Sequence, residues 1–297
     1  MIEAAIVTAI RARLASALAA ADENLRPLRI EGHSAGWLDG DRACRLAGFD
    51  DIFEVTGDAI EFAPTLRDEP SRTRAMDRVA RTLAAEGGLS AWRDERYAIA
   101  PALGARPWFL LERAAARYFG VRTFAVHING LVDNRGLPSM WIARRSATKS
   151  IDPGLLDNLV GGGIAAGHSV AYTVTKEAWE EAGIPAALAQ TAQPAGTVEV
   201  VRWQADGLQR ETLFVHDLHL PVDFAPAAQD GEAVEHRRVS FGEAARLIAC
   251  TSGPDVVTID ASLVVLDCLL RHRAISRDAP DLRALEALRR PARSPFD

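Results

Sequence analysis

The sequence predicts an α/β (α+β) fold, an α/β/α sandwich around a mixed sheet, with a smaller α+β domain on its N-terminal side. Strand-like segments lie on both sides of a helical segment over residues 170–182, which indicates a helix packed on a sheet. A second, more apolar helical segment over residues 259–273 supplies a helix behind that sheet. With 297 residues, 48% of them hydrophobic and 25% charged, the chain suits one large or two modest globular domains.

Residues 1–105 are expected to form the N-terminal α+β domain, because a Pro- and Gly-containing segment at 101–107 separates two patterns of elements. Ser71 is expected to cap a helix that ends at Ala85. The other elements expected here are an amphipathic helix over 3–22, extended pieces over 28–30 and up to residue 37, a helix over 41–47, and strands over 53–55 and 60–62 joined by a turn at 57–58.

Residues 106–275 are expected to form the larger domain, and residues 276–297 a helical tail that ends in a flexible Pro-Ala-Arg-Ser-Pro run. The elements expected in the larger domain are a helix over 111–119, strands over 123–129 and 139–144 joined by a turn at 133–136, the helix over 170–182, strands over 197–203 and 212–218, a helix over 241–249 capped near Ser240, and a helix over 259–273.

The most informative motif is a glycine-rich turn that leads into a helix rich in carboxylates. The turn holds glycines 161–163, and the helix carries Glu177, Glu180 and Glu181. Positions i, i+3 and i+4 share one face of a helix, so these three carboxylates repel each other unless a cation neutralises them. Hard oxygen ligands suit Mg²⁺ or Mn²⁺. A solvated acidic face is the commoner fate of such a string, but it leaves the spacing of the glycines unexplained.

This motif resembles the Nudix box, in which Gly, five residues, Glu and seven residues precede Arg-Glu-aliphatic-x-Glu-Glu-x-Gly-aliphatic. Gly162 takes the Gly position, and the residues from Glu177 to Ile184 match theirs, with Ala178 at the aliphatic position. Lys176 replaces the usual Arg and is expected to pair with a box Glu. His168 stands where the first Glu is usual; it either donates a hydrogen bond to phosphate or is a plain surface residue.

The flanking sequence resembles one branch of that family, the Nudix proteins related to the Nudix part of fungal thiamine pyrophosphokinase. The strings that carry this resemblance are Val-His-Ile-Asn-Gly at 126–130, Trp-Ile-Ala-Arg-Arg-Ser at 141–146 and Pro-Gly-Leu-Leu-Asp-Asn-Leu-Val-Gly-Gly at 153–162. The resemblance implies a Mg²⁺-dependent pyrophosphohydrolase acting on thiamine diphosphate or its damaged oxo and oxy analogues. Members of this branch commonly lack Glu at the position of His168.

The resemblance also implies roles for individual residues. Glu177, Glu180 and Glu181 would be both metal ligands and catalytic residues, and the carbonyl of Gly162 a further metal ligand. Glu232 is the candidate for an additional catalytic carboxylate from a later loop, although a solvated acidic loop explains it equally simply. The N-terminal domain could cover the active site and recognise the non-phosphate end of the substrate.

Basic and polar residues just upstream of the glycines are candidates for binding substrate. Arg144, Arg145 and Lys149 could receive a phosphate, or they could be a charged strand end that faces water. His127 and Asn129 could line a site for a flat heterocycle. Trp179 is expected to pack the carboxylate helix onto the sheet.

Composition restricts the partners and the compartment. The formal net charge of −6 and a pI near 5.7 give no electrostatic footprint for nucleic acid or an anionic membrane. Three widely spaced cysteines indicate reduced thiols, and the first residues lack a secretory pattern, so a cytoplasmic protein is expected. A homodimer is compatible with the sequence. Two alternatives stay open: hydrolysis of another nucleoside diphosphate derivative, and a non-catalytic Nudix-fold sensor of a phosphorylated ligand.

Overall fold

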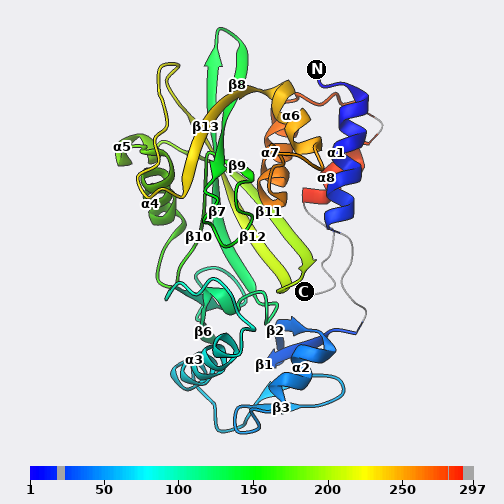
Figure 1. The fold of residues 1–297 in the computed structure, drawn as a ribbon, viewed down its shortest axis with the longest axis vertical. Coiled ribbons are helices and arrows are strands. Elements are labelled where there is room, and N and C mark those ends of the chain that lie inside the picture. Colours follow the sequence, from blue (N-terminus) through cyan, green and yellow to red (C-terminus); the bar gives the residue numbers. More distant parts are fainter. Residues whose placement is uncertain (19–23, 280, 290–297) are drawn as a thin grey trace.

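The structure, a computed structural model, describes residues 1–18, 24–279 and 281–289 (Figure 1). The larger domain is a mixed sheet with helices on both faces, and the N-terminal domain lies against one end of that sheet. The predicted α/β/α sandwich with a smaller α+β domain is therefore confirmed.

The N-terminal domain is built on a four-stranded sheet with the strand order β2-β1-β4-β3. The predicted strands over 53–55 and 60–62 are confirmed as an antiparallel pair, and a core of buried apolar residues joins the sheet to α3. The elements are β1 (Arg26–Ile30), β2 (His33–Leu38), α2 (Gly40–Leu46), β3 (Phe53–Val55), β4 (Ile60–Phe62), α3 (Glu69–Ala85) and the hairpin of β5 (Arg96–Ile99) with β6 (Phe109–Glu112).

Two predictions for this part of the chain are wrong. Asp68, and not Ser71, caps α3: its carboxylate accepts a hydrogen bond from the Ser71 amide at 2.8 Å, and the Ser71 hydroxyl accepts one from the Asp68 amide at 3.3 Å. The helix expected over 111–119 is instead the end of β6 followed by a single 3₁₀ turn, Arg113–Ala115. Pairing of β6 with β5 overrides the local helical pattern there.

The larger domain contains a seven-stranded sheet. Its main path runs β11-β12-β7-β8-β13, β10 pairs with β7, and β9 pairs with β8. The pairing of β12 with β7 is parallel and the others are antiparallel, so the sheet is mixed as predicted. The strands are β7 (Arg122–Asn134), β8 (Leu137–Arg145), β9 (Leu156–Asn158), β10 (Val160–Gly163), β11 (Gln193–Gln204), β12 (Gly207–His219) and β13 (Ala233–Ser240), of which β9, β10 and β13 were not predicted.

Helices cover both faces of this sheet (Figure 1). On one face, α4 (Val170–Ala182) and the short α5 (Ala186–Ala189) pack on Val126 and Ile128 of β7. On the other face, a second core contains α6 (Phe241–Ala249), α7 (Ile259–Arg271), α8 (Leu282–Arg289) and α1 (Ala4–Ala17). The first helix of the chain thus packs on the C-terminal helices, away from the N-terminal sheet. Residues 19–22 of its expected span, and the expected flexible run of the tail, lie outside the described residues.

Close backbone contacts hold the segment before β7 against both the N-terminal sheet and β12. The Trp37 amide donates to the Phe119 carbonyl at 2.9 Å, and the Leu208 amide at the start of β12 donates to the Arg117 carbonyl at 3.0 Å. Gly120 has φ of 55°, and a Cβ on it would lie 2.3 Å from the Trp37 carbonyl oxygen. The approach of these segments therefore requires glycine at this position.

Within the described ranges, no helix has both the length and the apolar character that a membrane crossing requires.

A matched pair of glycine substitutions tests this attachment. Gly120 and Gly136 both have φ in the left-handed region, but a Cβ on Gly136 meets nothing within 4 Å. Both alanine variants carry the left-handed strain, about 1–2 kcal/mol, and only Gly120→Ala adds a collision with backbone, about 1–3 kcal/mol. Thermal unfolding should show a melting temperature for Gly120→Ala at least about 3 °C below that of Gly136→Ala. Equal melting temperatures would show that the segments around Gly120 and Trp37 can move apart without loss of stability.

Candidate active site

The centre of the site is β10, where three consecutive glycines each leave room for a different neighbour. A Cβ on Gly161 would lie 3.0 Å from the His127 ring, one on Gly162 would lie 2.3 Å from the carboxyl carbon of Glu177, and one on Gly163 would lie 2.1 Å from the Tyr97 hydroxyl. Any side chain at these positions would push a neighbour away. The strand therefore lets residues from β7, α4 and the N-terminal domain converge on one backbone segment.

Helix α4 presents the box carboxylates to this strand. It spans Val170–Ala182 as predicted, begins with the Ser169 hydroxyl accepting from the Tyr172 amide at 3.1 Å, and ends at Gly183 in the left-handed conformation. Ala178 is fully buried against the sheet, whereas Trp179 is 51% exposed. The prediction that Trp179 packs on the sheet is wrong, because small residues take the inward face and bring the helix close.

Glu181 is the most buried carboxylate of the box. One of its oxygens accepts a hydrogen bond from the Gly161 amide at 2.8 Å, which fixes the side chain against β10. Burial raises the pKa of Glu181 to about 8, and the nearby Lys149 and the Gly161 amide only partly offset that effect. Burial likewise raises the pKa of Glu177, against a lowering by its hydrogen bond from Lys176. Without a cation at the site, Glu181 therefore holds a proton near neutral pH.

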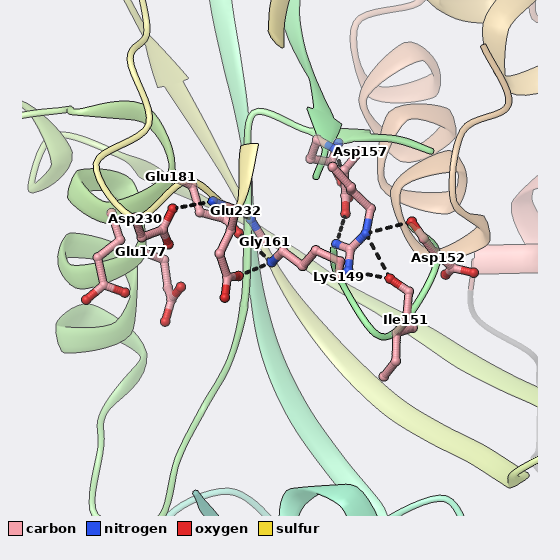
Figure 2. A network of polar contacts seen from close by, with 12 residues as sticks. Lys149, Ile151, Asp152, Asp157, Gly161, Glu177, Glu181, Asp230 and Glu232 are labelled. Atoms are coloured by element: carbon pink, nitrogen blue, oxygen red, sulfur yellow. Dashed lines mark hydrogen bonds and ion pairs between the residues drawn. The ribbon is translucent and has the colours of Figure 1, made fainter. Parts of the chain in front are cut away.

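Two lysines neutralise the carboxylates. As predicted, Lys176 pairs with the box, and its ammonium donates to Glu177 at 2.9 Å and to Glu180 at 2.6 Å. Lys149 forms an ion pair with Glu232, and its Nζ lies 3.6 Å from Glu181 Oε1. Figure 2 shows Lys149 reaching from its loop to Glu232 beside Glu177 and Glu181. The structure thus brings Glu232, from a loop far along the chain, to the box.

The N-terminal domain supplies further groups. Arg93 Nη1 lies 3.4 Å from Glu232 Oε1. Burial alone would raise the pKa of Glu232, but the hydrogen bond from Lys149 and the charges of Lys149, Arg93 and Arg113 hold it below its ordinary value. Tyr97 touches Gly163, and the Arg113 guanidinium lies 5.9 Å from the centre of the Tyr97 ring. No sequence signal identified these three residues, because their proximity to the box depends on how the domains pack.

A cavity lies between the two domains beside β10. Arg93, Tyr97 and Arg113 line it from the N-terminal domain, and His127, Arg145, Lys149 and glycines 161–163 line it from the larger one. His127 is buried and its Nδ1 lies 2.8 Å from Asn158 Oδ1. Arg145 donates to the Asp157 carboxylate at 2.7 Å and to the carbonyl of Ile151 at 2.9 Å. Of the residues predicted to bind substrate, His127, Arg145 and Lys149 are therefore brought together at the cavity.

Arg144 and Asn129 lie elsewhere. Arg144 is bonded to Glu235 at 2.7 Å and to Asp255 at 2.6 Å, outside the cavity lining. Asn129 is fully buried and donates to Asp217 at 3.0 Å. The two residues hold strand and helix segments together, and neither reaches the cavity.

His168 also lies outside the cavity lining. Its ring stacks on that of Tyr172, with the centroids 4.5 Å apart. It does not take the place of a missing carboxylate at the site.

The donor chemistry of the box suits a hard divalent cation. Glu177, Glu180, Glu181 and Glu232 supply only carboxylate oxygens, and the bare backbone of Gly162 lies directly against Glu177. In the parts of the chain that the structure describes, no three His, Cys, Asp or Glu side chains converge closely enough to hold an ion. The carboxylates are turned toward Lys149, Lys176 and the Gly161 amide, so an ion would have to displace the lysines.

Comparison with known proteins identifies the family. The model of the NUDIX domain matches residues 122–256, and that of a domain of unknown function, DUF4743, matches residues 7–123. Nudix hydrolase 24, chloroplastic, of Arabidopsis thaliana is 37% identical over 256 residues, which are 86% of this chain and 69% of that protein. Nudix hydrolase 20, chloroplastic, of the same plant is 36% identical over 255 residues, 83% of this chain and 67% of that protein. The chain belongs to the Nudix hydrolase family.

A solved structure, DR0079 of Deinococcus radiodurans, aligns with this Nudix hydrolase at 22% identity and a TM-score of 0.43, over 57% of this chain and 97% of that one. The two family models meet at residues 122–123, where β7 begins. The N-terminal region of this Nudix hydrolase is therefore a separate domain whose last residues lead directly into the central strand.

The raised pKa of Glu181 predicts how stability depends on pH. The folded, metal-free protein binds a proton there up to about pH 8, whereas an unfolded Glu loses it near pH 4.3. Glu181 therefore contributes its full stabilisation at pH values below its pKa in the unfolded chain. This stabilisation is lost as the pH rises through its pKa in the folded protein. Without metal, Glu181→Gln should melt higher than the wild type, by a margin that grows to a few degrees between pH 5 and pH 8.5.

The same variant should lose the rise in melting temperature that Mg²⁺ or Mn²⁺ gives the wild type, because the amide is a weaker ligand. Glu235→Gln is the matched control, since Glu235 pairs with Arg144 outside the cavity lining and its side chain is 43% exposed. A Glu181→Gln variant that melts below the wild type at every pH, or that still responds to metal, would contradict the assignment.

Proposed function

We propose that this Nudix hydrolase is a Mg²⁺- or Mn²⁺-dependent pyrophosphohydrolase that cleaves a small-molecule diphosphate. The observation that carries the proposal is the contact of Glu177 and Glu181 with the glycine strand, beside a cavity lined by lysine and arginine. Carboxylates packed against a bare backbone strand that itself lines a cavity with lysine and arginine suit an assembly of metal and phosphate, in which the metal neutralises the anion.

The residues divide into three groups. Glu177, Glu180, Glu181 and the carbonyl of Gly162 would hold the metal, which lowers the pKa of bound water and neutralises phosphate charge. Lys149, released from Glu232 and Glu181, would bind a phosphate oxygen, since it already lines the cavity. Glu232 would then be free to accept a proton from the attacking water, and the charge of Arg93, whose Nη1 lies 3.4 Å from Glu232 Oε1, would still favour the ionised carboxylate.

For the substrate, we propose thiamine diphosphate or its damaged oxo and oxy analogues, with the monophosphate and phosphate as products. The support is the resemblance of residues 126–162 to one Nudix branch. The names of the two plant relatives give no substrate. A different nucleoside diphosphate derivative is the alternative substrate, and binding without cleavage is the alternative activity. A cytoplasmic location, a homodimer and the absence of nucleic-acid and membrane partners stay predictions.

Hydrolysis of diphosphates in the presence of Mg²⁺ tests this proposal. Thiamine diphosphate and oxythiamine diphosphate should be followed by release of phosphate and ADP-ribose by release of AMP, with the wild type, Glu177→Gln and Glu181→Gln. Loss of a charged ligand should lower kcat/KM by at least about 100-fold in both variants, in line with removal of a few kcal/mol of electrostatic stabilisation. Glu235→Gln is the matched control, because Glu235 pairs with Arg144 outside the cavity, and its activity should stay within about twofold.

Two results would contradict the proposal. Turnover in EDTA, or unchanged turnover in Glu181→Gln, would exclude a metal held by the box. A ligand that raises the melting temperature while no diphosphate in the panel is cleaved would favour the sensor.

A further inference from the structure

The cavity beside β10 has a second, acidic end. It continues along the sheet face that carries Ala125 and His127 to Thr123 of β7 and to Gln209 and Glu211 of β12, and it ends at Asp260 in the first turn of α7. The glycine strand and Lys149 line one end, and Glu211 and Asp260 line the other. The wall also includes Arg210 and Arg117, and Arg117 pairs with Asp206. Glu211 and Asp260 therefore supply the carboxylates that could receive a positively charged or N–H group.

Glu211 is held in place but is not neutralised. Its Oε1 accepts from the Thr123 hydroxyl at 3.2 Å, and its Oε2 accepts from the Gln209 amide at 3.1 Å. Both donors are uncharged, and among the described residues Glu211 forms no ion pair. Burial raises the pKa of Glu211 and the charge of Asp260 raises it further, and the charge of Arg117 and the Gln209 hydrogen bond only partly offset this. A carboxyl group placed this way has acceptor capacity left over.

Asp260 lacks a partner for one of its oxygens. Its Oδ2 accepts from the same Gln209 amide at 2.9 Å, whereas Oδ1 is buried and has no hydrogen-bond partner in the described part of the chain. An Asp in the first turn stabilises a helix through the helix dipole, and this accounts for the residue type. It does not account for a buried, unsatisfied oxygen at a cavity wall, which costs free energy unless a donor reaches it.

Gln209 couples the two carboxylates. Its amide nitrogen donates to both, and its carbonyl oxygen accepts from Arg202 at 2.7 Å, so a buried hydrogen-bond chain fixes the orientation of the amide. Glu211 and Asp260 consequently present acceptor oxygens at the same end of the cavity. A phosphate is repelled from such an end, and an N–H group or a positively charged nitrogen is attracted to it.

We propose that Glu211 and Asp260 bind the organic part of the substrate through a cationic or N–H-bearing nitrogen. The substrate class is then a diphosphate ester of an amino-substituted or positively charged nitrogen heterocycle, with its diphosphate at the glycine strand. This inference rests on the proposed function for the orientation of the ligand. It assigns the recognition of the heterocycle to the sheet and to α7.

Steady-state kinetics with two substrates tests this assignment. Thiamine diphosphate carries a charged ring and an amino group, and dimethylallyl diphosphate carries no nitrogen. Glu211→Gln and Asp260→Asn should each raise KM for thiamine diphosphate by about 10-fold or more, the loss of one charge-assisted hydrogen bond. The kcat and the hydrolysis of dimethylallyl diphosphate should change less than about threefold, because the box is untouched.

Glu199→Gln is the matched control. Glu199 also accepts from a threonine hydroxyl, that of Thr212 at 2.9 Å, but it lies outside the cavity lining. The KM of the Glu199→Gln variant should stay at the wild-type value for both substrates. Equal KM changes for Glu199→Gln and Glu211→Gln, or equal effects of Glu211→Gln on both substrates, would overturn the assignment.

Calorimetry with phosphate-free heterocycles separates this inference from the proposed function. Thiamine, adenosine and cytidine bind without hydrolysis, so this readout stands even if no diphosphate is cleaved. At least one of the three should bind to the wild type with an affinity about 10-fold higher than to Glu211→Gln and to Asp260→Asn. Two variants are compared so that misfolding of one of them does not decide the result. If none of the three binds with a dependence on these carboxylates, the assignment fails.

Discussion

The structure depends on the absence of side chains at three consecutive positions of one strand. Gly161, Gly162 and Gly163 lie in the sheet beside β7. The space that a side chain would occupy at each position is filled by a group from a different element. The ring of His127, the carboxylate of Glu177 and the hydroxyl of Tyr97 fill that volume. A central strand, a surface helix and the N-terminal domain thus meet at a segment of bare backbone, and a metal or phosphate could approach that segment closely.

The site concentrates buried charge, and this has a cost in stability. Glu181 is desolvated, accepts a hydrogen bond from the Gly161 amide and lies 3.6 Å from Lys149. Lys176 pairs with Glu180, and Lys149 pairs with Glu232. In this arrangement the lysines partly take the place of a cation, and burial favours the protonated form of Glu181 although Lys149 opposes it. The same features that make Glu181 unfavourable in the metal-free fold make it a strong ligand, so function and stability are opposed at this residue.

Local signals in the sequence predicted the site's framework well. The bounds of α4 follow from Ser169, Gly183 and the helical spacing of its apolar residues, all of which lie within one segment. The two long hairpin strands and the helix beginning after Ser240 were likewise predicted from nearby residues. The box carboxylates could be named because their spacing fixes them on one helix face.

Features that depend on distant residues could not be predicted. Strand β7 is buried on both faces, so its pattern does not show that His127 reaches the cavity while Asn129 reaches Asp217. Arg93, Tyr97 and Arg113 approach the box only through domain packing. The failed helix over 111–119 and the exposed Trp179 have the same origin, since tertiary pairing and the small size of Ala178 decided them.

Anomalous diffraction from crystals soaked in Mn²⁺ tests the central claim most directly. The account predicts a Mn²⁺ peak bounded by the carboxylates of Glu177 and Glu181 and the backbone of Gly162, with Lys149 withdrawn from Glu232. A peak elsewhere on the molecule, or no peak while Lys149 stays on Glu232, would contradict it.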